Sequence, residues 1–128
     1  MHFFKKEEKL CSKKAIEAVF TSGRSFLVHP YKISWLISEK PLPYPAQVAI
    51  LVGKKNYKRA VDRNLIKRRI REAYRLNKNY LYDYLTNRNL NIIMLITYIS
   101  NEISDYSLME KKMKLLLEKL VKHYEDNP

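Results

Sequence analysis

The chain has 128 residues, of which 46% are hydrophobic and 30% are charged, a balance typical of one folded domain rather than a disordered segment. Its 25 lysines and arginines outnumber 13 aspartates and glutamates, so the formal net charge is +12. Such an excess indicates a polyanionic partner, nucleic acid first and an anionic membrane surface second. The single cysteine, Cys11, excludes an internal disulfide, and the presence of only two glycines excludes glycine-rich phosphate loops and dinucleotide-binding motifs.

No segment of the sequence predicts export or membrane insertion. The N-terminus lacks a long apolar core, and the most apolar run, 92–99, has only 8 residues, whereas about 20 are needed to span a bilayer. We therefore expect a cytoplasmic location. The sequence also lacks HExxH and CxxC motifs, which argues against a zinc site.

The first third of the chain predicts a helix followed by strands. Residues 1–10 are charged and are expected to form a flexible N-terminal segment. A short helix is predicted to begin after Ser12, its N-cap, and to end near Thr21, with Gly23 as a left-handed C-cap. Two strands are then predicted, at 26–28 and 31–37.

The rest of the chain predicts two further strands and two further helices. They are a strand at 46–52, a basic loop at 53–59, a helix at 60–77, a strand at 90–97 and a final helix from 104 or 105. The order is αβββαβα, which predicts an α+β fold: a two-layer sandwich with one four-stranded mixed sheet and a single domain over 1–128. Because a helix joins the third and fourth strands, these two are predicted to be parallel.

The helix at 60–77 carries the most informative pattern. Its apolar side chains lie on one side of a helical wheel, and six polar side chains fall within an arc of about 140° on the other. The six are Arg63, Asn64, Lys67, Arg68, Arg71 and Arg75. Like charges four residues apart repel, so the row is costly unless phosphates neutralise it. Four more cations lie in the preceding loop: Lys54, Lys55, Lys58 and Arg59. Together they predict an RNA-binding surface rather than an ordinary solvated helix face.

The segment 60–75 closely resembles the signature of the bacterial ribonuclease P protein component, an Ala-Val-x-Arg-Asn-x-Ile-Lys-Arg-x-Ile-Arg-like helix. The early helix that ends in Val19-Phe20-x-x-Gly23 and the basic turn before the signature also fit, so the resemblance covers most of the chain. Two positions depart from the family pattern: Leu65 stands where an arginine is usual, and Ile16 stands where an aromatic residue is common.

The resemblance implies a ribosomal protein S5 domain 2-like fold with a left-handed βαβ crossover. It implies a subunit of ribonuclease P, an endoribonuclease, that binds the catalytic RNA and the 5′ leader of precursor tRNA and assists removal of the leader. The catalytic centre would lie in the RNA, with Mg²⁺ bound mainly there, and the protein would supply no catalytic residue and no metal ligand. The implied partners are the catalytic RNA and precursor tRNA, without a membrane or an obligate protein partner.

The resemblance also implies two sites. Arg63, Asn64, Lys67, Arg68 and Arg71 match the positions that face the catalytic RNA. A cleft between the first helix and the sheet would receive the leader, lined by Ile16, Phe20, Tyr31, Lys32 and Trp35. Strand alternation leaves open which face of 31–37 lines this cleft: either Tyr31, Ile33 and Trp35, or Lys32 and Ser34.

Two other functions are considered. The alternative is another small basic RNA-binding protein, such as a ribosomal protein or an RNA chaperone, which would share the charge without needing this helix. A stand-alone nuclease would need a cluster of carboxylates around a metal or a general base, and Asp62, Glu72 and Asp105 do not form an evident cluster.

Overall fold

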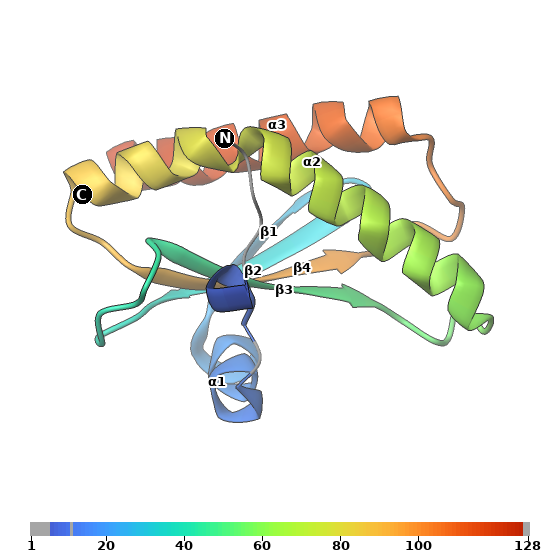
Figure 1. The fold of residues 1–128 in the computed structure, drawn as a ribbon, viewed down its shortest axis with the longest axis horizontal. Helices are drawn as coiled ribbons and strands as arrows, with labels where there is room; N and C mark the ends of the chain where they lie inside the picture. The colour runs from blue at the N-terminus through green and yellow to red at the C-terminus, as the bar shows by residue number, and fades with distance from the viewer. Residues whose placement is uncertain (1–5, 11, 127–128) are drawn as a thin grey trace.

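A computed structural model describes residues 6–10 and 12–126, so Cys11 and residues 1–5 of the segment expected to be flexible lie outside the described residues. The elements are η1 (Lys6–Glu8), α1 (Lys13–Ser22), β1 (Arg24–Val28), β2 (Tyr31–Ile37), β3 (Ala46–Val52), α2 (Ala60–Asn87), β4 (Ile92–Tyr98) and α3 (Tyr106–Asp126). The predicted αβββαβα order and α+β class are confirmed. Helices α2 and α3 cover one face of the sheet, and the shorter α1 adds a smaller layer on the other face (Figure 1).

The four strands form one mixed sheet in the order β1-β2-β4-β3. The β1–β2 and β2–β4 pairs are antiparallel, and β3 and β4 are parallel, as predicted for strands joined through a helix. Central strand β4 is buried almost throughout, because helices cover both faces of the sheet. The left-handed crossover stays a prediction from the resemblance.

The alternation of β2 divides its side chains between two cores. Tyr31, Ile33 and Trp35 belong to the large core under α2 and α3, whereas Leu36 packs into a smaller cluster on the α1 side. Because successive side chains of a strand point to opposite faces, Lys32 and Ser34 share the α1 side with Leu36. Of the two alternatives left open by the sequence, Lys32 and Ser34 therefore face α1, and Tyr31, Ile33 and Trp35 do not.

Residues 6–10 pack against the fold rather than trailing from it as expected. Lys9 forms a parallel bridge with Val48 on the outer edge of β3, and the Leu10 amide donates to the Val48 carbonyl oxygen at 2.9 Å. The Glu8 side chain is 1% exposed and forms an ion pair with Lys78 of α2. This segment covers one edge of the sheet.

Local signals at the helix ends are partly confirmed. Ser12 is the N-cap of α1, and its side-chain oxygen accepts a hydrogen bond from the Ala15 amide at 3.3 Å. Gly23 has φ −75°, so the predicted left-handed cap is wrong. Glycine is needed there for space, since an added Cβ would lie 2.4 Å from the Val19 carbonyl oxygen and 2.9 Å from that of Trp35.

Helix α2 is longer than predicted, ending at Asn87 rather than near 77. Leu81 and Leu85 continue the buried stripe at helical spacing, and both are fully buried. Tyr74, which a helical wheel places between the apolar side and the polar row, is also fully buried. The extra turns carry α2 across the whole length of the sheet (Figure 1).

Candidate nucleic-acid interface

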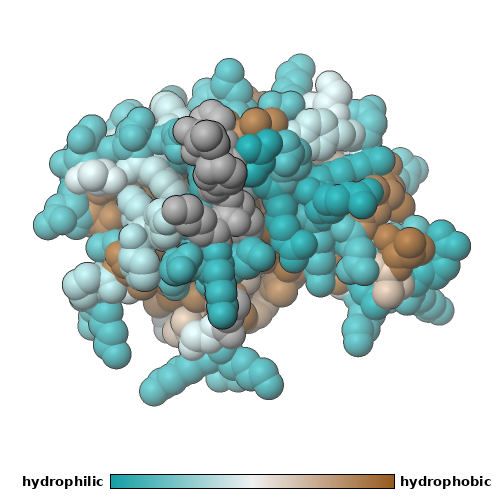
Figure 2. Space-filling view, in the orientation of Figure 1, coloured by the Kyte–Doolittle hydropathy of each residue, from teal (hydrophilic) through white to brown (hydrophobic). Residues whose placement is uncertain are grey.

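The first half of α2 presents a polar face because its apolar face is fixed to the sheet. Ile66, Ile70 and Ala73 have no exposed surface and belong to the large core. This anchoring turns the opposite side of the helix to solvent. Hydrophilic side chains gather over α2 in the space-filling view (Figure 2).

Three cations of this face form what we call the open set: Lys67, Arg68 and Arg71. Arg68 and Arg71 are exposed and Lys67 is half-buried. Within residues 6–10 and 12–126, the ion pairs are Arg59–Asp62, Arg75–Glu72 and Lys78–Glu8, and none includes a member of the open set. Their charges are therefore available to an external anion. The neighbouring Asn64 and the loop lysines Lys54, Lys55 and Lys58 are exposed as well.

Arg63 is arranged differently from the open set. Its guanidinium donates hydrogen bonds to the carbonyl oxygens of Tyr57 at 2.6 Å and Lys58 at 2.8 Å. Tyr57 is itself buried, and its hydroxyl donates to the carbonyl oxygen of Ser100 at 2.8 Å. Arg63 therefore fastens the basic loop onto α2, a role that sequence reasoning missed because it depends on where the loop carbonyls lie.

Two further cations of the predicted site are paired with acids three residues away. Arg59 bonds Asp62 at 2.9 Å, and Arg75 bonds Glu72 at 2.6 Å. The hydrogen bonds from these guanidinium groups lower the pKa of Asp62 and of Glu72. Arg59, Arg63 and Arg75 form what we call the tethered set. Since exposed ion pairs are weak, Arg59 and Arg75 can still exchange their partners for phosphates.

The face of the sheet next to α1 brings together part of the predicted leader cleft. Phe20 is 63% exposed, which is unusual for a ring that is free to pack. Ile16 is half-buried against the small cluster around Leu95, and Lys32 is exposed. Ser34 and Leu36, which lie on the same face, complete this surface, which we call the α1 face.

Tyr31 and Trp35 do not lie on the α1 face, so their predicted place in that cleft is wrong. Tyr31 has no exposed surface, and its hydroxyl donates to the Met109 carbonyl oxygen of α3 at 2.9 Å. Trp35 is 3% exposed and packs edge-on against Phe26, with ring centroids 5.3 Å apart. Both rings point toward the helices because the alternation of β2 places them in the large core.

Among residues 6–10 and 12–126, no three histidine, cysteine or acidic side chains come close enough to hold a metal ion. None of the described helices is both long and apolar enough to cross a membrane.

The fold and the polar face of α2 together define a small basic protein of the nucleic-acid-binding class. The family model for ribonuclease P matches residues 4–121. The chain therefore belongs to the ribonuclease P protein family, and its role is that of the protein component of ribonuclease P.

Relatives and solved structures agree with this assignment. The ribonuclease P protein component of Porphyromonas gingivalis is 34% identical over 109 residues, which cover 85% of this chain and 80% of that protein. The ribonuclease P protein component of Chlorobaculum tepidum is 45% identical over 73 residues, which cover 54% of this chain and 47% of that protein. The fold is similar to that of the RNase P protein from Thermotoga maritima, with a TM-score of 0.70 and 20% identity over 88% of this chain and 96% of that one. It is also similar to that of the RNase P protein from Staphylococcus aureus, with a TM-score of 0.69 and 18% identity over 90% of this chain and 96% of that one.

Proposed function

We propose that α2 docks onto the catalytic RNA of ribonuclease P through the open set. The observation that carries this proposal is that Lys67, Arg68 and Arg71 share one solvent-facing side of a helix without an acidic partner among the described residues. Arginine holds phosphate oxygens through two parallel hydrogen bonds, and each contact releases condensed counterions. Asn64 and the loop lysines extend this surface toward the start of the helix.

The α1 face binds the 5′ leader of precursor tRNA in this proposal. A single strand is held by aromatic platforms beside cations, and each stacked base contributes about 1–3 kcal/mol. Phe20 offers the platform and Lys32 the cation. Ile16 provides apolar contact but no stacking, because it has no ring.

The chemistry is assigned to the RNA. The protein would raise the affinity of the ribonucleoprotein for its substrate, and Mg²⁺ held mainly by the RNA would act at the scissile phosphate. The RNA would cleave the precursor at the junction between leader and tRNA, which leaves the mature 5′ end of the tRNA.

Reconstitution tests this division of labour. The full chain is mixed with its cognate RNA subunit at low Mg²⁺, and cleavage of precursor tRNA is measured against RNA alone and protein alone. We expect cleavage only when the RNA is present, with faster turnover when the protein is added. Cleavage by the protein alone, or no response of the RNA to the protein, would overturn the proposal.

The leader assignment has its own test. Phe20→Ala removes the platform, so it should weaken binding of substrates that carry a 5′ leader and leave binding of mature tRNA nearly unchanged. Leu115→Ala is the control, because Leu115 is 43% exposed on α3, which covers the other face of the sheet. An equal effect of Phe20→Ala on both RNAs would reject the α1 face as the leader site.

A further inference from the structure

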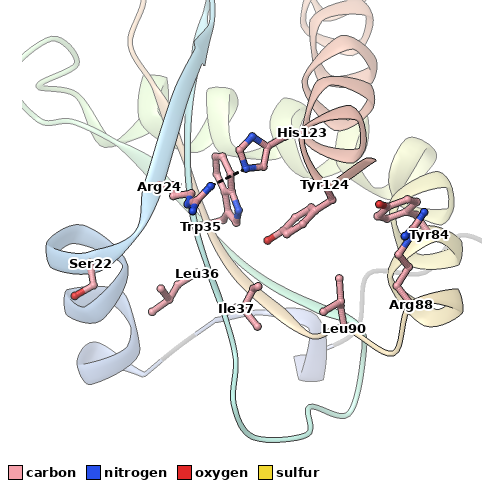
Figure 3. A pocket seen from close by; sticks show the side chains of 10 residues that line it. All are labelled: Ser22, Arg24, Trp35, Leu36, Ile37, Tyr84, Arg88, Leu90, His123 and Tyr124. Atoms are coloured by element: carbon pink, nitrogen blue, oxygen red, sulfur yellow. Dashed lines mark hydrogen bonds between the residues drawn. The ribbon is translucent and has the colours of Figure 1, made fainter. Parts of the chain in front are cut away.

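A cavity of about 530 Å³ lies at the end of α2 that is remote from the basic loop. It lies where the start of β1, the end of β2, the last turn of α2 and the last turns of α3 meet (Figure 3). Six of the side chains that line it carry its chemistry: Arg24, Trp35, Tyr84, Arg88, His123 and Tyr124. The volume falls within the range of about 300–1,000 Å³ that is typical of small-ligand sites.

The lining combines rings with guanidinium groups. The Arg24 guanidinium lies 3.1 Å from Nε2 of His123, and the Arg88 guanidinium lies over the Tyr84 ring, 4.8 Å from its centroid. In Figure 3 these two arginines lie on opposite sides of the space into which Tyr124 points. All ten lining residues are described, and none is an aspartate or a glutamate.

Cations continue from this cavity along α3. A neighbouring cavity of about 610 Å³ shares Arg24, Trp35 and His123 with the first and adds Lys119 and Lys122. Asp126 is its one acidic lining residue. A cationic track beside aromatic side chains is the arrangement with which proteins hold single-stranded nucleic acid.

We propose that this cavity binds one unstacked RNA nucleotide, with its base against the tyrosine rings and its phosphates on Arg24 and Arg88. An RNA ligand is favoured because the cations face rings rather than acids and because the chain carries a net charge of +12. Arg88 lies 13 residues beyond Arg75, about 20 Å along α2, so an RNA docked on the polar face of α2 can extend to it. This site adds to the proposed function. Ser22 of α1 and Leu36 of the α1 face also line it, but neither Phe20 nor Lys32 does.

Trp35 provides a direct signal, since it is the only tryptophan of the chain and lines both cavities. The full chain is titrated with a uridine heptamer while tryptophan fluorescence is recorded at several salt concentrations. We expect a saturable change, and a lower affinity in the double variant Arg24→Gln with Arg88→Gln. Losing two phosphate contacts should reduce the slope of log affinity against log salt by about 1.4.

A matched control separates local contacts from net charge. Lys111→Gln with Lys114→Gln removes the same charge from exposed positions of α3 that line neither cavity, and it should leave the affinity nearly unchanged. Equal losses in the two double variants would overturn the proposal. An abasic heptamer that binds as tightly as the uridine heptamer would also overturn it, because the rings would then have no role.

The source of the nucleotide is resolved in the holoenzyme. If the leader fills the cavity, Arg24→Gln with Arg88→Gln weakens only substrates with long leaders. If the catalytic RNA fills it, the variant weakens binding of that RNA whatever the leader length. No change in either measurement would overturn the proposal. Phe20→Ala should leave the Trp35 response intact, so failure of the leader assignment on the α1 face is distinguishable from failure of this one.

Discussion

The two halves of α2 differ in whether their cations are exposed without an acidic partner or buried in an ion pair. In the first half, the open set lies on the solvent side with no acidic partner among the described residues. In the second half, Lys78 is 5% exposed and pairs with Glu8, whose carboxylate also accepts a hydrogen bond from the Tyr82 hydroxyl at 2.7 Å. The same helix thus offers the open set to an outside polyanion and uses Lys78 in an internal ion pair.

The difference follows from the cost of removing ions from water. An exposed cation keeps its hydration, so leaving it unpaired destabilises the fold little. A buried cation loses that hydration and needs a partner with good geometry. Burial also disfavours a charge on Tyr82, which bonds Glu8. Its burial, the nearby Tyr74 and the Glu8 carboxylate raise the pKa of Tyr82 far above its ordinary value. Cations of the first half should therefore govern binding, and Lys78 should govern stability.

The largest effect on stability is expected for Lys78→Ala. It leaves the Glu8 carboxylate buried without its cation, which should lower the free energy of unfolding by about 3–5 kcal/mol, as measured by urea denaturation. Lys111→Ala, at an exposed position, should change it by no more than about 0.5 kcal/mol. Glu8→Leu with Lys78→Met leaves no unpaired charge and should recover much of the loss. Equal stability of Lys78→Ala and the wild type would remove the contrast between the two halves.

The next effect concerns the open set. Arg68→Ala with Arg71→Ala should flatten the salt dependence of binding to the catalytic RNA by about two units, one for each lost phosphate contact. The free energy of unfolding should change by less than about 0.5 kcal/mol, because both side chains are exposed and have no acidic partner among the described residues. The comparison variant is Arg59→Ala with Arg75→Ala, which removes the same charge from residues that bond acids and should have the smaller effect. If Arg59→Ala with Arg75→Ala flattened the salt dependence more than Arg68→Ala with Arg71→Ala, the open set would not be the main RNA contact.

A smaller effect is expected for Arg63→Ala. It removes two hydrogen bonds to loop carbonyls, so the basic loop should lose protection from hydrogen exchange and the fold should lose about 1–3 kcal/mol. Asn64→Ala, at the adjacent exposed position, is the control and should leave loop exchange unchanged. If both variants weaken RNA binding but neither alters loop exchange, Arg63 acts as a direct contact and not as a fastener.

The smallest effect is expected for Glu72→Gln. The hydrogen bond from Arg75 lowers the pKa of Glu72 from its ordinary value of 4.5, so the pair stabilises the fold above about pH 4.5 and the contribution is lost as pH falls through the folded-state value. The melting temperatures of the wild type and the variant should differ slightly at pH 7 and converge near pH 3. A difference that persists at pH 3 would show that the pair is not its cause. Since the variant also releases Arg75, RNA affinity should rise.

Local periodicity predicted much of the molecule correctly. The wheel places Ile66, Ile70, Ala73 and Leu76 on the apolar side. The first three are fully buried, whereas Leu76 is 37% exposed. Ser12 was identified as a cap because its oxygen can reach an amide three residues away, and it does. Such features depend on neighbours in sequence, which is why sequence patterns reveal them. The further turns of α2 were also readable, since Leu81 and Leu85 continue the stripe without a glycine or proline to stop it.

Other features depend on which element packs where, and the sequence left them open or gave the wrong answer. Alternation in β2 defines two sets of side chains but does not say which set faces α1. Trp35 and Tyr31 lie in the large core because α2 and α3 cover that face. Likewise, the sequence does not distinguish Arg63 from the other cations of the row. Its role depends on the positions of the Tyr57 and Lys58 carbonyl oxygens, which only the fold defines.

The segment around Glu8 has a consequence for the order of assembly. Residues 6–10 leave the ribosome before the residues on which they dock, since Val48 lies about 40 positions later and Lys78 is 70 positions from Glu8. During synthesis, this segment must therefore wait for much of the fold before it can dock. Until they do, the outer edge of β3 is unpaired and can recruit a strand from another copy. Chains that lack residues 1–10 should keep that edge open permanently and self-associate.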